Sequence, residues 1–348
     1  MVLKKIVIAN FRNFSHAVFP FGESLTVIIG LNAKGKTNLL ESIYFICHGS
    51  GFRESKEEEL VTIGEKMLRV QARFRKADHH VDFQIVVKKN DHGFTKVFTI
   101  NKTPKKYFSY SRETTRAVLF SPEQITLMIG PPESRREYFN KLISFYDPEY
   151  KKRLINYESA LRKRNKLFEQ IVDPEKLQEE LVFWNEYLEE QATYITLKRK
   201  EYADFLNAHP TVDEKSFKIE YLADEFTKTR LKESFENERR YRRTLIGPQK
   251  DDFCIYAKEV KSLKNLHHFG SRSEQRLTIF WLKLNEINYY RLIFSQKPIL
   301  LLDDIFSELD HHNKTLVLKL IGGYQTVMTT TETEVLEMID NPYSIIRL

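Results

Sequence analysis

The chain has 348 residues, of which 41% are hydrophobic and 30% are charged, with a formal net charge of +7 at pH 7. This composition excludes a disordered or fibrous protein and suits a folded chain with more than one core. No apolar run approaches the roughly 20 residues of a membrane span, and the apolar part of residues 1–9 is too short for a signal peptide. Cys47 and Cys254 show neither metal spacing nor a disulfide framework, which favours a reducing cytoplasm.

The first 125 residues alternate short apolar runs with turns, a pattern typical of strands. We expect strands at residues 3–9, 25–29, 68–74, 81–87 and 96–100. A helix that begins at Lys36 interrupts them. This part of the chain is therefore predicted to be a lobe of mixed α/β type.

Residues 30–37 read Gly-Leu-Asn-Ala-Lys-Gly-Lys-Thr and directly follow the apolar run at residues 25–29. The pattern G-x-x-x-x-G-K-[ST] between a strand and a helix predicts a phosphate-binding loop, whereas a chance glycine-rich turn would not need these neighbours. Backbone N–H groups of such a loop surround phosphate oxygens, Lys36 adds a positive charge, and the Thr37 hydroxyl can ligate Mg²⁺. We expect nucleotide contacts from Gly30, Leu31, Asn32, Ala33, Lys34, Gly35, Lys36, Thr37 and Asn38.

From residue 131 to about 208 the pattern changes to helices rich in Lys, Arg, Glu, Leu and Tyr. Asp147-Pro148 and Asp173-Pro174 predict two helix starts, with Asp as the N-cap and Pro at the first helical position. The second of these helices is long, but its heptads are not sustained as in a long coiled coil. Basic clusters in the middle third favour a surface for a phosphate backbone over separate solvated helix faces; they lie at residues 151–153, 162–164, 198–200 and 239–243.

Residues from about 244 return to an α/β pattern, with a strand at 253–257, a helix at 277–292 and a strand at 325–328. Before the last strand, a continuous apolar run ends in Asp303 and Asp304, as is typical of a buried parallel strand. Ligands bind at the carboxyl ends of such strands. We therefore expect Asp303 to hold Mg²⁺ and Asp304 to orient or deprotonate an attacking water, the alternative being a strand end with two solvated carboxylates.

The two motifs are far apart, since Lys36 and Asp303 are separated by 303 − 36 = 267 positions. A small kinase or GTPase keeps both motifs within one compact domain, whereas ABC-type and SMC-like ATPases bring an N-terminal and a C-terminal lobe together. We predict an α/β fold, an ABC-type P-loop ATPase head formed by lobes at residues 1–130 and 244–348. A mainly helical domain at residues 131–243 is inserted between them.

The order of the motifs resembles that of the RecF family of bacterial recombination-repair ATPases over essentially the full chain. The resemblance rests on residues 3–14, the phosphate loop and helix at 32–43, Gly-Pro-Pro-Glu-Ser-Arg-Arg at 130–136, residues 147–150 and 157–165, and Leu-Asp-Asp-Ile-Phe-Ser-Glu-Leu-Asp at 302–310. It implies a head that binds ATP and Mg²⁺ and forms a homodimer when ATP binds.

The resemblance also implies roles for residues outside the phosphate loop. ATP on one copy would meet a signature serine of the other, and Ser271 occupies that position. Asp310 would lie near the dimer seam, Gln124 would be the loop glutamine that senses Mg²⁺, and Arg12 would contact the nucleotide, although a surface arginine explains Arg12 nearly as well. The implied protein is a weak, DNA-stimulated ATPase of the cytoplasm and nucleoid. It would bind double-stranded, gapped and single-stranded DNA and act with RecR and RecO to load RecA.

The signature departs from the family pattern, because Ser273 and Glu274 stand where glycine and glutamine are usual. Serine lacks the freedom of glycine at φ > 0. Glu274 would repel a docked γ-phosphate unless it is paired with Arg272, Arg276 or a metal. We therefore expect intact ATP binding with slower dimerisation or hydrolysis. The family's Gly-Pro-His-Arg-Asp-Asp also appears as Gly-Pro-Gln-Lys-Asp-Asp, at residues 247–252.

Two other function classes stay open. One is an SMC-like structural or nuclease-partner head that acts through a long coiled coil, which the short middle segment disfavours. The other is a DNA-binding protein that uses ATP only as a structural ligand, with which Ser273 and Glu274 are compatible. A nucleotide kinase or small-molecule transferase is disfavoured by the distance between the two motifs.

Overall fold

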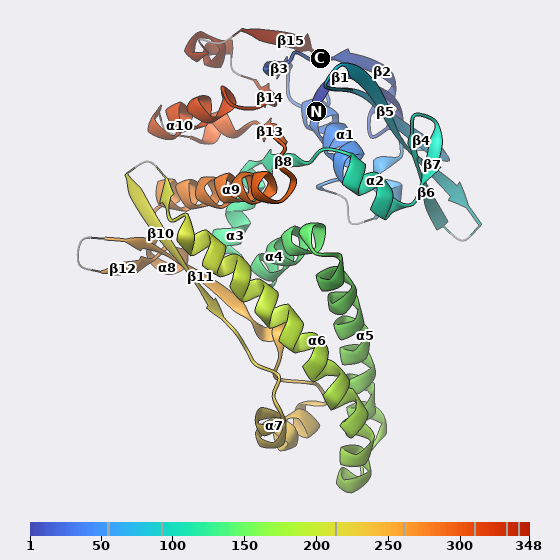
Figure 1. Cartoon of the computed structure of the whole chain (residues 1–348), viewed down its shortest axis with the longest axis vertical. Coiled ribbons are helices and arrows are strands. Elements are labelled where there is room, and N and C mark those ends of the chain that lie inside the picture. The colour runs from blue at the N-terminus through green and yellow to red at the C-terminus, as the bar shows by residue number, and fades with distance from the viewer. Residues whose placement is uncertain are drawn as a thin grey trace. The chain divides into compact units, whose positions relative to one another are not determined.

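The computed structural model describes residues 1–53, 56–91, 93–212, 214–259, 262–309, 311–331, 333–339 and 342–348. Its residues form two compact units, which we describe one at a time (Figure 1). The first unit combines Met1–Glu123 with Glu286–Leu348, two segments that are far apart in the sequence. The second unit is the continuous stretch Gln124–Asn285.

A parallel sheet with the strand order β15-β3-β14-β13-β8 lies in the first unit. Its strands are β3 (Leu25–Ile29), β8 (Ala117–Phe120), β13 (Ile299–Asp303), β14 (Thr326–Thr330) and β15 (Tyr343–Arg347). β8, β13 and β14 are buried along their whole length, as expected for parallel strands that are covered on both faces. Because all the strands run in one direction, β3 and β13 end at the same edge of the sheet, with β14 between them.

An antiparallel sheet with the order β2-β1-β4-β5-β6-β7 completes the strands of the first unit. Its strands are β1 (Val2–Phe11), β2 (Phe14–Pro20), β4 (Met67–Lys76), β5 (His79–Asn90), β6 (Gly93–Ile100) and β7 (Thr103–Lys105). In β4, apolar residues that are buried alternate with polar residues that are not, which is the period of a sheet with one solvated face. The strands predicted at residues 3–9, 68–74, 81–87 and 96–100 are all present.

The phosphate-loop helix α1 (Lys36–His48) shares one hydrophobic core with both sheets. Leu39, Leu40, Ile43, Phe45 and Ile46 of this helix are completely buried in that core. The unit also contains α2 (Tyr107–Glu113), α10 (His311–Ile321), the second half of α9 (Arg272–Phe294) and the short turns Glu57–Leu60, Ile305–Glu308 and Thr333–Met338. Since α1 is packed against strands of both sheets, its N-terminus is held firmly at the sheet edge.

Helices dominate the second unit. They are α3 (Thr126–Ile129), α4 (Pro132–Tyr146), α5 (Pro148–Gln170), α6 (Pro174–Ala208), α7 (Lys228–Tyr241), α8 (Leu266–Phe269) and the first half of α9. The two predicted caps are confirmed, because Asp147 accepts a hydrogen bond from the backbone N–H of Tyr150 at 3.0 Å and Asp173 from that of Lys176 at 2.9 Å. α5 and α6 run side by side (Figure 1). Across the part of the chain that the structure describes, no helix is both long and apolar enough to span a membrane.

The second unit also has a sheet, with the order β12-β11-β10-β9. Its strands are β9 (Thr211–Val212), β10 (Lys215–Leu222), β11 (Asp252–Lys258) and β12 (Leu263–Asn265). Trp281 of α9 stacks on Phe217 of β10, with 5.3 Å between ring centroids, and both side chains are buried. Residues 244–285 therefore group with the helical insertion, so the units differ from the divisions at 130/131 and 243/244 drawn from the sequence. The pairing of β11 with β10 is the physical reason.

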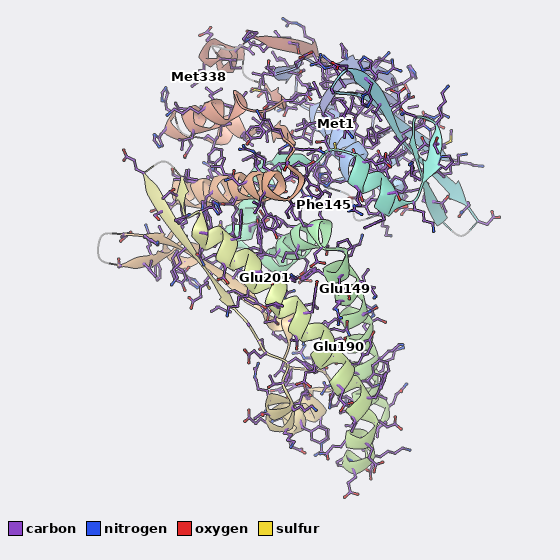
Figure 2. All side chains as sticks on the ribbon, viewed as in Figure 1. Met1, Phe145, Glu149, Glu190, Glu201 and Met338 are labelled. Atoms are coloured by element: carbon purple, nitrogen blue, oxygen red, sulfur yellow. The ribbon has the colours of Figure 1, made fainter. Side chains whose placement is uncertain are left out.

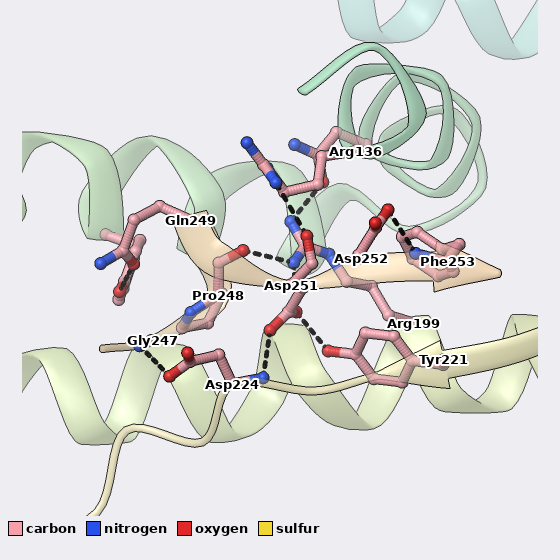
Figure 3. Close-up of polar contacts among 12 residues, drawn as sticks. Arg136, Arg199, Tyr221, Asp224, Gly247, Pro248, Gln249, Asp251, Asp252 and Phe253 are labelled. Carbon is pink, nitrogen blue, oxygen red and sulfur yellow. Dashed lines mark hydrogen bonds and ion pairs between the residues drawn. The ribbon is translucent and has the colours of Figure 1, made fainter. Parts of the chain in front are cut away.

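The segment Gly247–Asp252 is fixed by buried polar contacts that we call the Asp251 network, formed by Arg199, Tyr221, Asp224 and Asp251 (Figure 3). The carboxylate of Asp251 is completely buried and accepts hydrogen bonds from Arg199 Nη1 at 2.5 Å, from the backbone N–H of Asp224 at 2.7 Å and from the Tyr221 hydroxyl. Arg199 also donates to the Pro248 carbonyl at 2.8 Å. The network thus ties α6 to β10 and to the start of β11.

Candidate nucleotide-binding site

The phosphate loop joins the end of β3 to the start of α1, as the sequence predicts. Ala33 and Gly35 both adopt positive φ, 64° and 102°. A Cβ at Gly35 would lie 2.7 Å from Asn13 Nδ2, at the end of a side chain that can shift, so glycine is required there by its positive φ rather than by space. Ala33 is not a glycine, so its left-handed backbone is strained. Such strain is often found in ligand-binding loops.

Lys36 is buried beneath this loop. Its Nζ donates hydrogen bonds to the carbonyl of Gly30 at 2.7 Å and to that of Leu31 at 3.1 Å. The ammonium is therefore enclosed by the backbone of the loop, at the positive N-terminus of α1, which is a favourable place for phosphate groups.

The Thr37 hydroxyl and Asp303 are in direct contact, although they lie 266 positions apart. Thr37 Oγ1 donates to Asp303 Oδ1 at 2.9 Å, and Thr329 Oγ1 of β14 donates to the same oxygen at 2.9 Å. Burial raises the pKa of Asp303, and the hydrogen bonds from Thr329 and Thr37 oppose this rise only in part. A hydroxyl and a carboxylate at one point are oxygen donors of the type that Mg²⁺ takes together with substrate phosphates, so these residues fit the expected ion.

Asp304 follows at the same edge of the sheet and has a left-handed backbone, with φ 48°. Its N–H donates to Thr329 Oγ1 at 2.9 Å, so Thr329 links the ends of β13 and β14. In the sequence, Thr329 begins the segment 329–331, which stands where ABC transporters carry a switch histidine, but we assigned it no role. Its position near the end of a predicted strand could have identified it, because Asp303 and Asp304 were expected at the carboxyl ends of the parallel strands.

Arg12 lies in the turn between β1 and β2, again with positive φ, 52°. Its Nε donates to Glu41 Oε2 at 2.8 Å and its Nη2 to Glu41 Oε1 at 3.1 Å, while its Nη1 reaches the Glu59 carbonyl at 2.7 Å. Glu41 is completely buried and also accepts from Arg53. Arg12 is thus a structured residue rather than a free surface arginine. Glu41 and Arg53 were missed in the sequence, where only the i, i+4 spacing of Thr37 and Glu41 on one helix face gave a hint.

Ser271 is exposed just before the start of α9, in the second unit, and forms a capping box with Glu274. The N–H of Ser271 donates to Glu274 Oε2 at 2.8 Å, and the N–H of Glu274 donates to Ser271 Oγ at 3.3 Å. Lys264 Nζ lies 2.9 Å from Glu274 Oε2. Burial raises the pKa of Glu274, but the bonds from Ser271 and Lys264 outweigh that effect and lower it to about 2. Glu274 is therefore paired with Lys264 and, at 3.9 Å, with Lys215, and not with the anticipated Arg272 or Arg276.

The remaining site residues are divided between the units. Gly30–Asn38, Arg12, Asp303 and Asp304 all belong to the first unit. Gln124 is half-buried in a short turn, Pro122–Ile125, and is grouped with the second unit, as is Ser271. Asp310 lies outside the described residues.

The basic clusters of the second unit are not all surface features, which corrects part of the sequence interpretation. Arg164 is 1% exposed and bonded to Glu238 Oε2 at 2.7 Å, and Arg199 belongs to the Asp251 network. Arg153 donates to Glu149 on α5 and to Glu190 on α6, two carboxylates labelled in Figure 2. The exposed members of the clusters are Lys151, Lys152, Arg162, Lys163, Lys200, Arg240, Arg242 and Arg243.

Comparison with known proteins decides the family. Residues 2–347 match the family model described as "RecF/RecN/SMC N terminal domain". The chain belongs to the RecF family. It is 32% identical to the DNA replication and repair protein RecF of Natranaerobius thermophilus, over 96% of this chain and 92% of that protein. It is 30% identical to the protein of the same name from Lachnospira eligens, over 99% of this chain and 96% of that protein.

Solved structures agree with this assignment. The recombination mediator protein RecF-ATPrS of the RecFOR pathway matches with a TM-score of 0.87 at 30% identity, covering 99% of this chain and 95% of that one. A RecF-ATP structure matches with a TM-score of 0.81 at 30% identity, covering 96% and 93%. The Smc head domain from Pyrococcus furiosus shares the fold, with a TM-score of 0.53 at 18% identity over 99% and 93%. The predicted α/β fold, an ABC-type P-loop ATPase head, is confirmed.

Proposed function

We propose that this RecF family member is an ATP-dependent DNA-binding protein of recombinational repair and replication-fork maintenance. The observation that carries the proposal is the hydrogen bond between Thr37 and Asp303, which unites the phosphate loop with the distant acidic strand. The names of the similar proteins support the biological setting, since they are DNA replication and repair proteins and a recombination mediator bound to ATP.

In this proposal, different residues bind the phosphates, hold Mg²⁺ and orient the attacking water. Backbone N–H groups of the loop and Lys36 bind the phosphates, and Thr37 and Asp303 hold Mg²⁺, which neutralises charge on the phosphates when it is bound. Asp304 orients the attacking water. Gln124 contributes from its turn as a sensor of Mg²⁺, and Arg12 supports the nucleotide from the β1–β2 turn.

A second copy of the chain completes the site in this proposal. Ser271 and the N-terminus of α9 from that copy donate to the γ-phosphate, and Asp310 lies near the seam. ATP thereby becomes part of a homodimer interface on gapped or junction DNA, and slow hydrolysis releases it. The dimer acts with RecR and RecO in loading RecA.

Sedimentation velocity tests this mechanism. Wild type should move from monomer to dimer with ATP and Mg²⁺, with or without double-stranded DNA, while Lys36→Met should stay monomeric because it loses the ammonium at the phosphates. Lys66→Met, which removes one exposed lysine of the same unit, is the matched control and should dimerise normally. A wild-type protein that binds no ATP would overturn the proposal.

A second candidate is an ATP-stabilised DNA-binding factor with little turnover. The capping box favours it, because the Glu274 carboxylate occupies the N–H of Ser271 that a γ-phosphate would otherwise approach. The double variant Ser273→Gly/Glu274→Gln restores the usual family residues. If it hydrolyses ATP much faster than wild type while both bind ATP alike, the second candidate describes the natural chain better.

A further inference from the structure

Three aromatic rings lie together on α6 in the second unit, and the proposed function uses none of them. The rings of Phe183 and Tyr187 are nearly parallel, at an interplanar angle of 22° with 6.1 Å between centroids, and Trp184 stands edge-on to Phe183 at 5.0 Å. We call these three residues the Phe183 cluster; it ends about one helical turn before Glu190, which is labelled in Figure 2. Phe183 is 62% exposed and the adjacent Val182 is 56% exposed. Neighbouring apolar side chains that are this exposed indicate an interaction surface rather than core packing.

Other aromatic rings of α6 are already covered by cations of the same chain. Lys163 Nζ of α5 lies 5.2 Å from the ring centroid of Trp184. Tyr194, further along α6, has two cations over its ring, at 5.2 and 5.6 Å. Among the residues that the structure describes, no cation lies over Phe183 or Tyr187. These two rings can therefore accept a cation that comes from another molecule.

The surroundings of the cluster are acidic. Residues 174–190 of α6 contain six glutamates and one lysine, although the whole chain has a net charge of +7. Glu179, Glu180 and Glu186 are exposed, and no described residue forms an ion pair with them. They lie three or four positions from Phe183, so their side chains flank its ring on the helix surface.

Open aromatic rings among carboxylates select a cationic ligand. The glutamates would repel the phosphate backbone of DNA, which disfavours nucleic acid on this part of α6. An arginine side chain fits both features, because its planar guanidinium group stacks on a ring while its donors pair with carboxylates. The chemistry thus points to a protein that presents arginine.

We propose that the Phe183 cluster and the three glutamates beside it form a docking surface for a basic, arginine-bearing segment of a partner protein. An arginine of that partner lies over Phe183 and Tyr187, and ion pairs with the glutamates fix its position. Aromatic side chains surrounded by polar groups are the usual anchors of protein interfaces. Every residue of this surface lies on α6, within the second unit, so the contact does not depend on ATP.

Binding of a fluorescent arginine/alanine peptide to the full chain, measured by anisotropy, tests the inference. Wild type should bind it more tightly than a lysine/alanine peptide of equal length, because a guanidinium group stacks better than an ammonium group, and should not bind a glutamate/alanine peptide. Phe183→Ala should weaken binding about threefold to thirtyfold, the range for one cation–π contact. Phe183→Leu should weaken it as well, because leucine keeps the apolar bulk without a ring. Phe108→Ala, which removes a 50% exposed phenylalanine from α2, is the matched control and should bind like wild type.

The dependence of binding on salt tests the glutamates. Exposed ion pairs are screened by salt, so the affinity of wild type for the arginine/alanine peptide should fall as the salt concentration rises. Glu179→Gln combined with Glu186→Gln should lower the affinity at low salt and flatten this dependence. An unchanged dependence would show that the glutamates do not bind the peptide and would overturn the proposed surface.

Other outcomes would also overturn the inference. It fails if the arginine/alanine peptide shows no saturable binding, or binds wild type and Phe183→Ala alike. If oligothymidylate binds instead and Phe183→Ala weakens that binding, the occupant is single-stranded DNA. If wild type forms a nucleotide-free dimer that Phe183→Ala disrupts, the occupant is a second copy of the chain. Lys36→Met should bind the peptide like wild type, so a failure of the proposed ATP site is distinguishable from a failure of this inference.

Discussion

Replacement of Asp251 by asparagine should strongly destabilise the second unit. The carboxylate accepts from Arg199 and Tyr221 on one oxygen and from the N–H of Asp224 on the other. An asparagine has only one carbonyl oxygen, so its NH₂ group must face a donor on one of these sides. Arg199, which is 2% exposed, would also lose its counter-charge.

The size of the effect follows from these contacts. Removing one partner of a buried ion pair costs about 3–5 kcal/mol, and a buried donor left unsatisfied costs about 1–3 kcal/mol. The two costs overlap, so we expect about 3–5 kcal/mol, a large part of the roughly 5–15 kcal/mol that stabilises a typical domain.

Urea unfolding followed by tryptophan fluorescence measures this change. Both tryptophans of the chain, Trp184 and Trp281, lie in the second unit, so their emission reports on that unit. The midpoint should fall at an unchanged slope. Glu236→Gln, which breaks an exposed pair with Arg239, is the control and should cost less than about 1 kcal/mol. A loss below about 1 kcal/mol for Asp251→Asn would refute the reasoning.

Three further predictions concern other contacts. The folded-state pKa of Glu274 is about 2, below its ordinary value of 4.5. The stabilisation from its hydrogen bonds is therefore present above pH 4.5 and is lost as the pH falls toward 2. The Tm difference between wild type and Glu274→Gln should shrink over that pH range. Thr329→Val removes a hydrogen bond to Asp303 and should lower ATP turnover about tenfold in a steady-state assay, whereas an unchanged kcat would show that this bond does not serve catalysis. Arg242→Gln combined with Arg243→Gln should flatten the dependence of DNA affinity on salt by about one to two units of slope, and an unchanged slope would assign the DNA contact to other residues.

The sequence was sufficient for the parts of the site that depend on local pattern. The phosphate loop is a contiguous motif with its strand and helix, and Asp303 ends an apolar run that only a buried strand explains. A single rule, that ligands bind at the carboxyl ends of parallel strands, then placed Thr37 and Asp303 together. Their hydrogen bond across 266 positions bears out that reasoning.

The ion-pair partners of two buried arginines could not be predicted from the sequence pattern. Arg164 and Arg199 occur within basic triplets, yet their partners Glu238 and Asp251 lie 74 and 52 positions away. A signal did exist, because Arg199 continues the buried stripe of Ala192 and Ile195 on α6. Charge clustering was given more weight than helical spacing, although an ion pair can satisfy a charge on the buried face. Glu41 was missed for a different reason, because its partners Arg12 and Arg53 come from turns rather than from a repeating pattern.

The order of strands in the parallel sheet also constrains how the protein is made. Both neighbours of β3, namely β14 and β15, come from the opposite end of the chain, beyond the whole of the second unit. The second unit is a continuous stretch, whereas β3 has no hydrogen-bonded strand partner until β14 and β15 have been made. The phosphate loop is therefore encoded early but acquires its supporting sheet last.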